Sequence, residues 1–176
     1  MKTIETDRLI LRGWRLEDAD DFFEYARHPE VGPNGGWPPH GSREESLKVI
    51  QYFIDDDDIW AIVLKETGKV IGSVGLHKDS KRVGISVREL GFVVSADYWG
   101  QGIATEAAKR AVKYAFEDME LALVSTYHKS FNDRARRVVE KCGFTREGML
   151  RQGSKRYDGL VFDAVCYSIL RAEYEG

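Results

Sequence analysis

The residues best suited to chemistry lie in one stretch, residues 89–108, where a strand-like run leads through two glycines into a helix-like run. Gly100 and Gly102 allow the backbone to approach an anion closely, because glycine has no side chain and adopts positive φ freely. The helix that follows points unpaired N–H groups and the positive end of its dipole at the same place. This junction is therefore suited to holding a pyrophosphate.

Two other nucleotide-binding turns differ from this stretch in their spacing. A P-loop requires a lysine and then serine or threonine after its second glycine, whereas this chain continues with Ile103, Ala104 and Thr105. A dinucleotide-binding turn follows its strand directly and needs a third small residue where Thr105 stands. The sequence therefore excludes a P-loop and matches a dinucleotide turn only weakly.

The same stretch resembles motif A of the GNAT acyl-CoA N-acyltransferases, which has the pattern Gln/Arg-x-x-Gly-x-Gly/Ala. Gly102 and Ala104 match the last two positions, while Trp99 stands where glutamine or arginine is usual. The family uses backbone amides there, so this departure is modest. Residues 98–108 resemble the branch that contains the ribosomal-protein N-terminal acetyltransferases.

Three further matches follow the order of the family. Asn132 and the run from Val138 to Phe144 are similar to motif B, with Ala135 in place of the commoner serine. The other two matches are residues 6–12 with the later Asp20-Asp21, and the closing strand pair near Asp163. Together the matches cover nearly the whole chain, which is identified as a member of the GNAT family.

The resemblance implies transfer of an acetyl group from acetyl-CoA, the cosubstrate, to a primary amine by direct attack, without a metal. The backbone of residues 92–94 would hold the pantetheine arm, and residues 101–105 would hold the pyrophosphate. Asn132 would hydrogen-bond the pantetheine while capping the helix that it begins. The implied cofactor-binding residues are Phe92, Val93, Val94, Gln101, Gly102, Ile103, Ala104, Thr105 and Asn132.

The resemblance also suggests catalytic roles. A backbone N–H near Phe92 or Val93 would stabilise the oxyanion. Glu89, on the cofactor strand, is the candidate base, and a structural carboxylate paired with an arginine is the equal alternative. His128 is a rival base or a surface histidine in a loop, and water is a third candidate. Tyr127 is the candidate proton donor to the departing thiolate, which is a good leaving group and can depart without an acid.

The acceptor amine is open among several classes. A protein or peptide α-amine is favoured over a polyamine, aminoglycoside or aryl amine, because its pKa near 8 leaves a useful neutral fraction. The long loop at residues 28–42, with Trp37 and paired prolines, would face the acceptor. The acidic run at residues 55–58 is either a solvated helix end or a wall suited to a polycation. A non-catalytic acyl-CoA-binding module is the alternative outside enzymes.

Alternating strand-like and helix-like patterns must position these residues. We expect one α/β (α+β) domain over residues 1–176, with a GNAT-like mixed, largely antiparallel sheet of six to seven strands, about four helices and splayed central strands. A capping box at residues 42–45 predicts a helix start, and Ile103, Ala107, Ala111 and Ala115 share a helical face. The expected strands are residues 8–12, 59–64, 70–76, 86–95, 121–127, 144–151 and 160–170.

Composition narrows the class of protein further. The chain has 176 residues and a net charge of -3, which argues against nonspecific nucleic-acid binding. The two cysteines, Cys142 and Cys166, form no CxxC pair, and we interpret both as packing residues in a reducing, cytoplasmic setting. No stretch suits a signal peptide or a membrane span, and the sequence allows a homodimer.

Overall fold

Eight strands form one mixed sheet, in the order β1-β2-β3-β4-β5-β6-β8-β7, in a computed structural model that describes residues 1–174. The strands are β1 (Ile4–Glu5), β2 (Leu9–Arg12), β3 (Ile59–Leu64), β4 (Val70–Lys78), β5 (Val87–Val94), β6 (Leu123–Lys129), β7 (Thr145–Lys155) and β8 (Val161–Leu170). Neighbouring strands are antiparallel, except that β5 and β6 are parallel.

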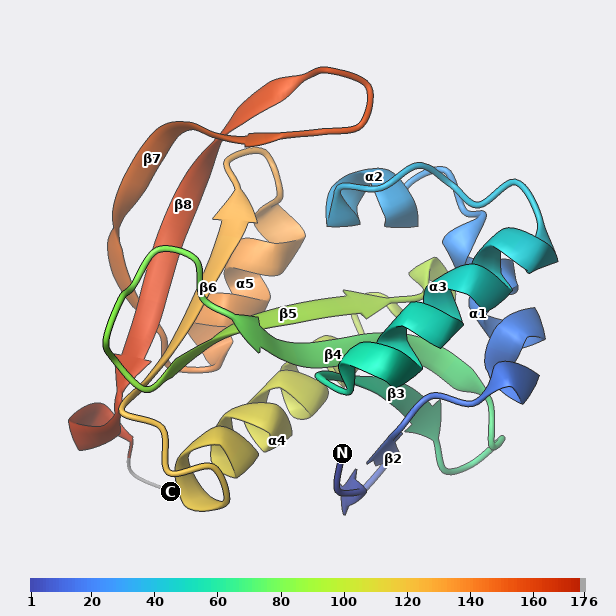
Figure 1. The fold of residues 1–176 in the computed structure, drawn as a ribbon, viewed down its shortest axis with the longest axis horizontal. Coiled ribbons are helices and arrows are strands. Elements are labelled where there is room, and N and C mark those ends of the chain that lie inside the picture. Colours follow the sequence, from blue (N-terminus) through green and yellow to red (C-terminus); the bar gives the residue numbers. More distant parts are fainter. Residues whose placement is uncertain (175–176) are drawn as a thin grey trace.

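Helices cover both faces of the sheet (Figure 1). They are α1 (Ala19–Ala26), α2 (Val31–Gly35), α3 (Arg43–Asp56), α4 (Ile103–Glu117) and α5 (Asp133–Lys141). The helices α4 and α5 pack on one face, and α1 and α3 pack on the other, as the two separate clusters of buried residues show. The sheet therefore has one face covered by α4 and α5 and an opposite face covered by α1 and α3.

The face of α4 that meets the sheet is the one that the sequence predicted. Ile103, Ala107, Ala111 and Ala115 are all buried against the strands. Three alanines in a row on this face let the helix axis lie close to the sheet, because no long side chain separates the two backbones. This close packing fixes the start of α4 relative to β5.

On the opposite face, aromatic rings hold α1 and α3 together. The Trp14 ring lies 5.1 Å from that of Phe22 and 5.4 Å from that of Phe53, measured between centroids. The α3 start is capped as predicted, since the Ser42 hydroxyl accepts a hydrogen bond from the Glu45 N–H (3.2 Å). The helix α3 ends at Asp56, and β3 begins at Ile59 directly after it.

The predicted mixed α/β architecture is confirmed, and the structure adds two short elements to it. The sheet gains an eighth strand because the two-residue β1 pairs with β2. A fifth helix, α2, lies within residues 28–42, where the sequence predicted a continuous loop. Glycine and proline give α2 low helix propensity, but the Trp37 ring covers Gly32 and Gly35 so closely that a Cβ on either would clash with it. Tertiary packing therefore maintains α2.

Candidate active site

The two central strands are paired only at their beginnings. Their parallel register ends at the pair Glu89 and Ser125, and the strands separate beyond it, as predicted (Figure 1). The Thr126 hydroxyl of β6 donates to the Leu90 carbonyl of β5 (2.9 Å). The backbone N–H and C=O groups of the even-numbered residues of β5 therefore face β6. Because strand backbone groups alternate in direction, the N–H of Phe92 points into the gap where no strand is beside it.

The glycine turn lies at the end of β5. Gly100 and Gly102 have φ values of 78° and 80°, which other residues adopt only with strain. Gly102 is the N-cap of α4 and offers no side chain to its first N–H groups. The Trp99 indole donates to the Val94 carbonyl (2.9 Å) and so ties the turn to β5. An anion at this turn would meet unpaired backbone donors.

A polar clamp joins the N-terminal segment to this turn. Glu106, in the first turn of α4, accepts hydrogen bonds from the Thr6 hydroxyl and the Arg8 N–H, and it pairs with the Arg8 guanidinium (2.6 Å). Arg8 also donates to the Gln101 carbonyl (3.1 Å). Burial would raise the pKa of Glu106, but these hydrogen bonds outweigh it and lower the pKa. The N-terminal match at residues 6–12 and the motif A match at residues 89–108 are therefore in direct contact in the structure.

A cavity of about 360 Å³ lies between β5, the glycine turn and α5. It is lined by every predicted cofactor-binding residue except Gln101, whose side chain donates instead to the Asp97 carbonyl (3.0 Å). The predicted residues in the lining are Phe92, Val93, Val94, Gly102, Ile103, Ala104, Thr105 and Asn132. The structure therefore brings residues from three separate elements around one space.

Three basic residues that sequence reasoning missed also line this cavity. Arg134, Arg137 and Lys141 all come from α5. Their positions, separated by three and four residues, place them on one helical face, and this spacing was the available signal. The Arg134 guanidinium lies 4.0 Å from the Trp99 ring centre, so a cation also covers the glycine turn. The cavity suits a ligand with several negative charges.

Asn132 caps α5 as expected, and its expected hydrogen bond to the pantetheine stays a prediction. Its side-chain oxygen accepts a hydrogen bond from the Ala135 N–H (3.1 Å) and caps α5. Because the oxygen is engaged in the cap, the amide N–H₂ group is what Asn132 can offer to a ligand in the cavity.

The segment at residues 28–42 also contributes to the cavity between β5, the glycine turn and α5. Val31, Asn34 and Gly35 of α2 belong to the cavity lining. The Lys129 ammonium at the end of β6 donates to the Asn34 carbonyl (3.0 Å), and burial lowers the pKa of this lysine. Trp37 packs against His40 at 5.1 Å between ring centres and against α2, so it does not form the open acceptor wall that we expected.

Glu89 and Tyr127 lie on the face of the sheet opposite to α4 and α5, and both contact the side chain of the same lysine. The Lys81 ammonium forms an ion pair with Glu89 (2.5 Å) and lies 4.7 Å from the Tyr127 ring centre. Burial raises the pKa of the Tyr127 hydroxyl. Both predicted catalytic residues therefore lie near Lys81, and their catalytic roles stay predictions. Glu89 is ion-paired, as in its structural alternative, but with a lysine in place of an arginine.

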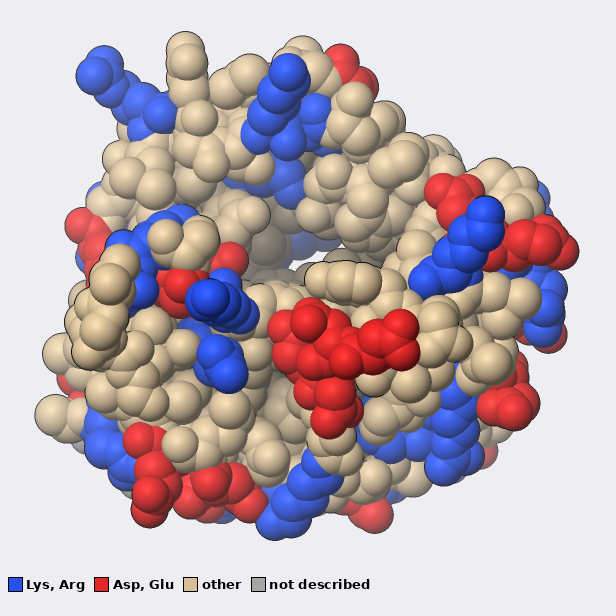
Figure 2. Space-filling model, in the orientation of Figure 1, with Lys and Arg blue, Asp and Glu red and all other residues tan. Residues whose placement is uncertain are grey.

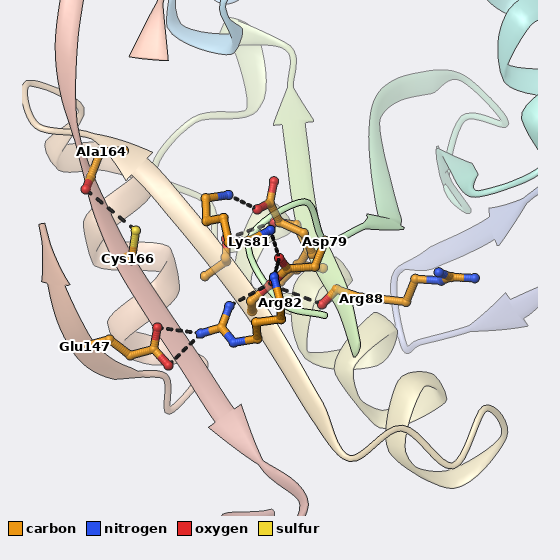
Figure 3. A network of polar contacts seen from close by, with 11 residues as sticks. Asp79, Lys81, Arg82, Arg88, Glu147, Ala164 and Cys166 are labelled. Atoms are coloured by element: carbon orange, nitrogen blue, oxygen red, sulfur yellow. Dashed lines mark hydrogen bonds and ion pairs between the residues drawn. The ribbon is translucent and has the colours of Figure 1, made fainter. Parts of the chain in front are cut away.

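A buried network fixes the loop that carries Lys81 (Figure 3). Asp79, whose side chain has 0% exposure, accepts hydrogen bonds from the Ser125 hydroxyl (2.6 Å) and the Arg82 guanidinium (2.9 Å). Arg82 continues to Glu147 on β7 (2.6 Å). Burial would raise the pKa of Asp79, but its hydrogen bonds lower the pKa overall. This network joins the β4–β5 loop to β6 and β7.

His128 does not lie where the sequence placed it. It belongs to β6 and is buried, instead of lying in a surface loop. Its Nδ1 bonds to the Lys129 carbonyl (2.9 Å) and its Nε2 to the Tyr167 hydroxyl (3.4 Å). One residue after Tyr127, it faces the opposite side of the sheet from Glu89, because strand side chains alternate. It is not placed to act as a base beside Glu89.

Cys142 fits the interpretation as a packing residue. Its thiol contacts the Thr105 carbonyl (3.8 Å), and burial raises its pKa to about 11. A thiol with this pKa carries almost no thiolate at neutral pH and is a poor nucleophile.

Two negative findings apply to residues 1–174. No group of three or more His, Cys, Asp or Glu side chains is arranged to hold a metal ion. None of the helices in this part of the chain is both long and apolar enough to cross a membrane.

A sheet that splits between two parallel strands, with a glycine turn suited to an anion beside the split, is the arrangement that the resemblance to acyl-CoA-dependent transferases implied. The sequence profile described as the Acetyltransferase (GNAT) domain matches residues 8–145. The chain therefore belongs to the GNAT family and is an acetyl-CoA-dependent N-acetyltransferase.

Individual relatives agree with this assignment. The chain is 30% identical over 181 residues to Uncharacterized N-acetyltransferase p20 of Bacillus licheniformis, with 100% of both chains covered. It is 35% identical over 109 residues to YdaF of Bacillus subtilis (strain 168), a provisionally named ribosomal N-acetyltransferase, covering 62% of this chain and 58% of YdaF. The fold matches a GNAT-family acetyltransferase from Bacillus anthracis with a TM-score of 0.88 and 24% identity, covering 98% of this chain and 100% of that one.

Proposed function

We propose that this enzyme holds acetyl-CoA in the cavity between β5, α4 and α5 and acetylates the α-amine of a peptide or protein. The pyrophosphate would lie at the glycine turn beside the three basic residues of α5. The pantetheine would follow the backbone of residues 92–94, and the Phe92 N–H would stabilise the oxyanion. A cytoplasmic location belongs to this proposal, since both cysteines are free.

An open groove is the observation that carries the acceptor proposal. Between β5, β6 and β7 a cavity of about 440 Å³ includes Glu89 in its lining and extends to Met149 and Leu150. Met149 and Leu150 are each 47% exposed, so the groove continues to the surface. Figure 2 shows the molecule hollowed at the centre of one face. An open groove with charged and apolar walls accommodates a chain that extends beyond the reacting amine.

The acidic run favours a small polycation as the second candidate. Figure 2 shows carboxylates gathered over the C-terminal end of α3, beside the hollow. Several of these groups already have local partners, however. Asp55 accepts from Gln51 (2.8 Å), Asp57 pairs with the N-terminal amine, and Asp58 bonds to His77 (3.0 Å). We therefore prefer the peptide acceptor.

The deciding experiment measures free-thiol release from acetyl-CoA with N-terminal peptides, polyamines, aminoglycosides and aryl amines. Each active peptide is paired with its N-terminally acetylated copy, which keeps every lysine but has no α-amine, and mass spectrometry locates the new acetyl group. We expect peptides with a free α-amine to have the highest kcat/KM. A small amine that exceeds every peptide by more than tenfold would overturn the peptide acceptor and leave the acetyltransferase assignment intact.

A further inference from the structure

A histidine and an aspartate meet on the acceptor face of the sheet. His77 on β4 stands opposite Glu89 on β5, so both side chains project from the same face. The His77 Nδ1 lies 3.0 Å from Asp58 Oδ2. Asp58 is held beside β4 because its carbonyl accepts a hydrogen bond from the Leu76 N–H (2.9 Å).

The hydrogen bond to Asp58 determines the state of the imidazole. An ionised carboxylate only accepts hydrogen bonds, so the Nδ1 of neutral His77 carries the proton. Its Nε2 then has a free lone pair. Asp58 Oδ1 is buried without a hydrogen-bond partner among the described residues, so His77 is the main polar partner of this carboxylate. Burial raises the pKa of Asp58, and the contact with His77 opposes that rise.

The contacts of the ring place Nε2 beside the part of β5 that lies beyond its last pair with β6. The imidazole lies over the facing pair Gly75 and Gly91, in space that side chains there would fill. A Cβ on Gly91 would be 3.1 Å from Nε2, and one on Gly75 would be 2.9 Å from it. Gly91 directly precedes Phe92, whose N–H points into the gap. The Nε2 atom therefore lies close to the residue that precedes the backbone proposed to hold the thioester.

Glu89 is less well placed for the same task. Its carboxylate is engaged by the Lys81 ammonium, which the Asp79 network holds in position. Proton transfer to Glu89 would break this ion pair, whereas proton transfer to His77 would strengthen its contact with Asp58. The charged groups that face His77 are Asp58 itself, Asp56 at the end of α3, and Glu89 with Lys81.

We propose that His77 is the base that accepts a proton from the acceptor amine, with Asp58 as its positioning residue. The neutral amine forms the C–N bond at the thioester carbonyl, and the C–S bond breaks. The sulfur leaves as the CoA thiolate with the electron pair of that bond, and the proton released by the nitrogen moves to His77 Nε2. This inference rests on the proposed acetyl-CoA site, but it does not depend on which amine is the acceptor.

The test uses the full chain and the best acceptor of the panel, whether peptide or small amine. His77→Gln keeps a polar group of similar length without a titrating nitrogen, and Asp58→Asn keeps the shape without the charge. The matched control is Asp55→Asn, an exposed carboxylate of the same acidic run whose hydrogen bond is to Gln51. Stabilisation by acetyl-CoA verifies that each variant is folded and binds the cofactor.

For His77→Gln we expect kcat to fall by about 100-fold or more and the acid limb of the pH–rate profile to disappear. For Asp58→Asn we expect about a tenfold fall and an acid limb moved to lower pH, because the protonated imidazole loses a stabilising charge. The profile is measured with two acceptors whose amines differ in pKa. A limb that arises from titration of the amine would move between the two acceptors, whereas a limb that arises from the enzyme would not. An acid limb that persists in His77→Gln, or that Asp58→Asn leaves unmoved, would overturn the proposal. Loss of the limb in Glu89→Gln alone would assign the role to Glu89.

Discussion

The Glu106→Gln variant keeps the shape of the side chain that joins α4 to the N-terminal segment but removes its charge. In the native protein Glu106 is 20% exposed and pairs with Arg8, which is 47% exposed. Hydrogen bonds to a charged group contribute about 1.5–3 kcal/mol when they are shielded from water. Solvent screens the half-exposed Arg8, so we expect a total loss of about 1–2 kcal/mol at pH 7.

The loss should depend on pH in a defined direction. Burial opposes ionisation of Glu106, but hydrogen bonds from Thr6 and Arg8 outweigh it and lower its pKa in the folded state. A lowered pKa gives stability that is present above the unfolded value, about 4.3, and is lost as pH falls through the folded value. The difference in stability between the wild type and the variant should therefore shrink as pH falls below about 4.3.

Thermal and urea unfolding at pH 7 and pH 3 measure this difference. For a domain of this size a loss of 1 kcal/mol lowers Tm by about 2–4 °C, so we expect a fall of about 2–8 °C at pH 7. Glu117→Gln on the same helix is the control, because its contact with Lys113 is exposed and 3.7 Å long, and the amide oxygen can still accept the hydrogen bond from the Tyr174 hydroxyl. The clamp argument is refuted if both variants unfold alike at pH 7, or if the Glu106→Gln deficit is unchanged at pH 3.

Three further predictions concern the site. Gly102→Val should abolish the stabilisation by acetyl-CoA, about 2.7 kcal/mol at 100 times Kd, because valine is strained at a φ of 80° and would distort the turn that lines the cavity. Gly84→Val should retain that thermal shift, since Gly84 has a similar φ of 74° but lies in open space. Tyr127→Phe should lower kcat less than tenfold, since thiolate leaves readily, and a loss of 100-fold or more in steady-state assays would contradict this. Asp79→Asn should lower the free energy of unfolding by about 3 kcal/mol at pH 7. This loss should be smaller at acid pH, because the folded-state pKa of Asp79 is lowered. Urea titrations that give an equal loss at both pH values would contradict the network argument.

The sequence by itself determined the features that depend on near neighbours. The spacing of Ile103, Ala107 and Ala111 predicted the buried face of α4, and the Ser42 cap predicted where α3 begins. The sequence also placed glycine at position 102, where the backbone has a positive φ of 80° that glycine adopts without strain. In each case the determining interaction lies within about one helical turn, so the order of residues specifies it.

The tertiary structure alone decided which distant side chains share a face of the sheet. His77 and Asp58 are 19 positions apart, and Thr6 and Glu106 are 100 apart, yet each pair is in contact. Strand register determines such meetings, and a shift of one residue would turn every side chain of a strand to the other face. His128 shows the consequence, because the same strand that presents Tyr127 to Lys81 buries the next residue on the other side of the sheet. Register depends on packing of the whole sheet, and no local pattern in the sequence specifies it.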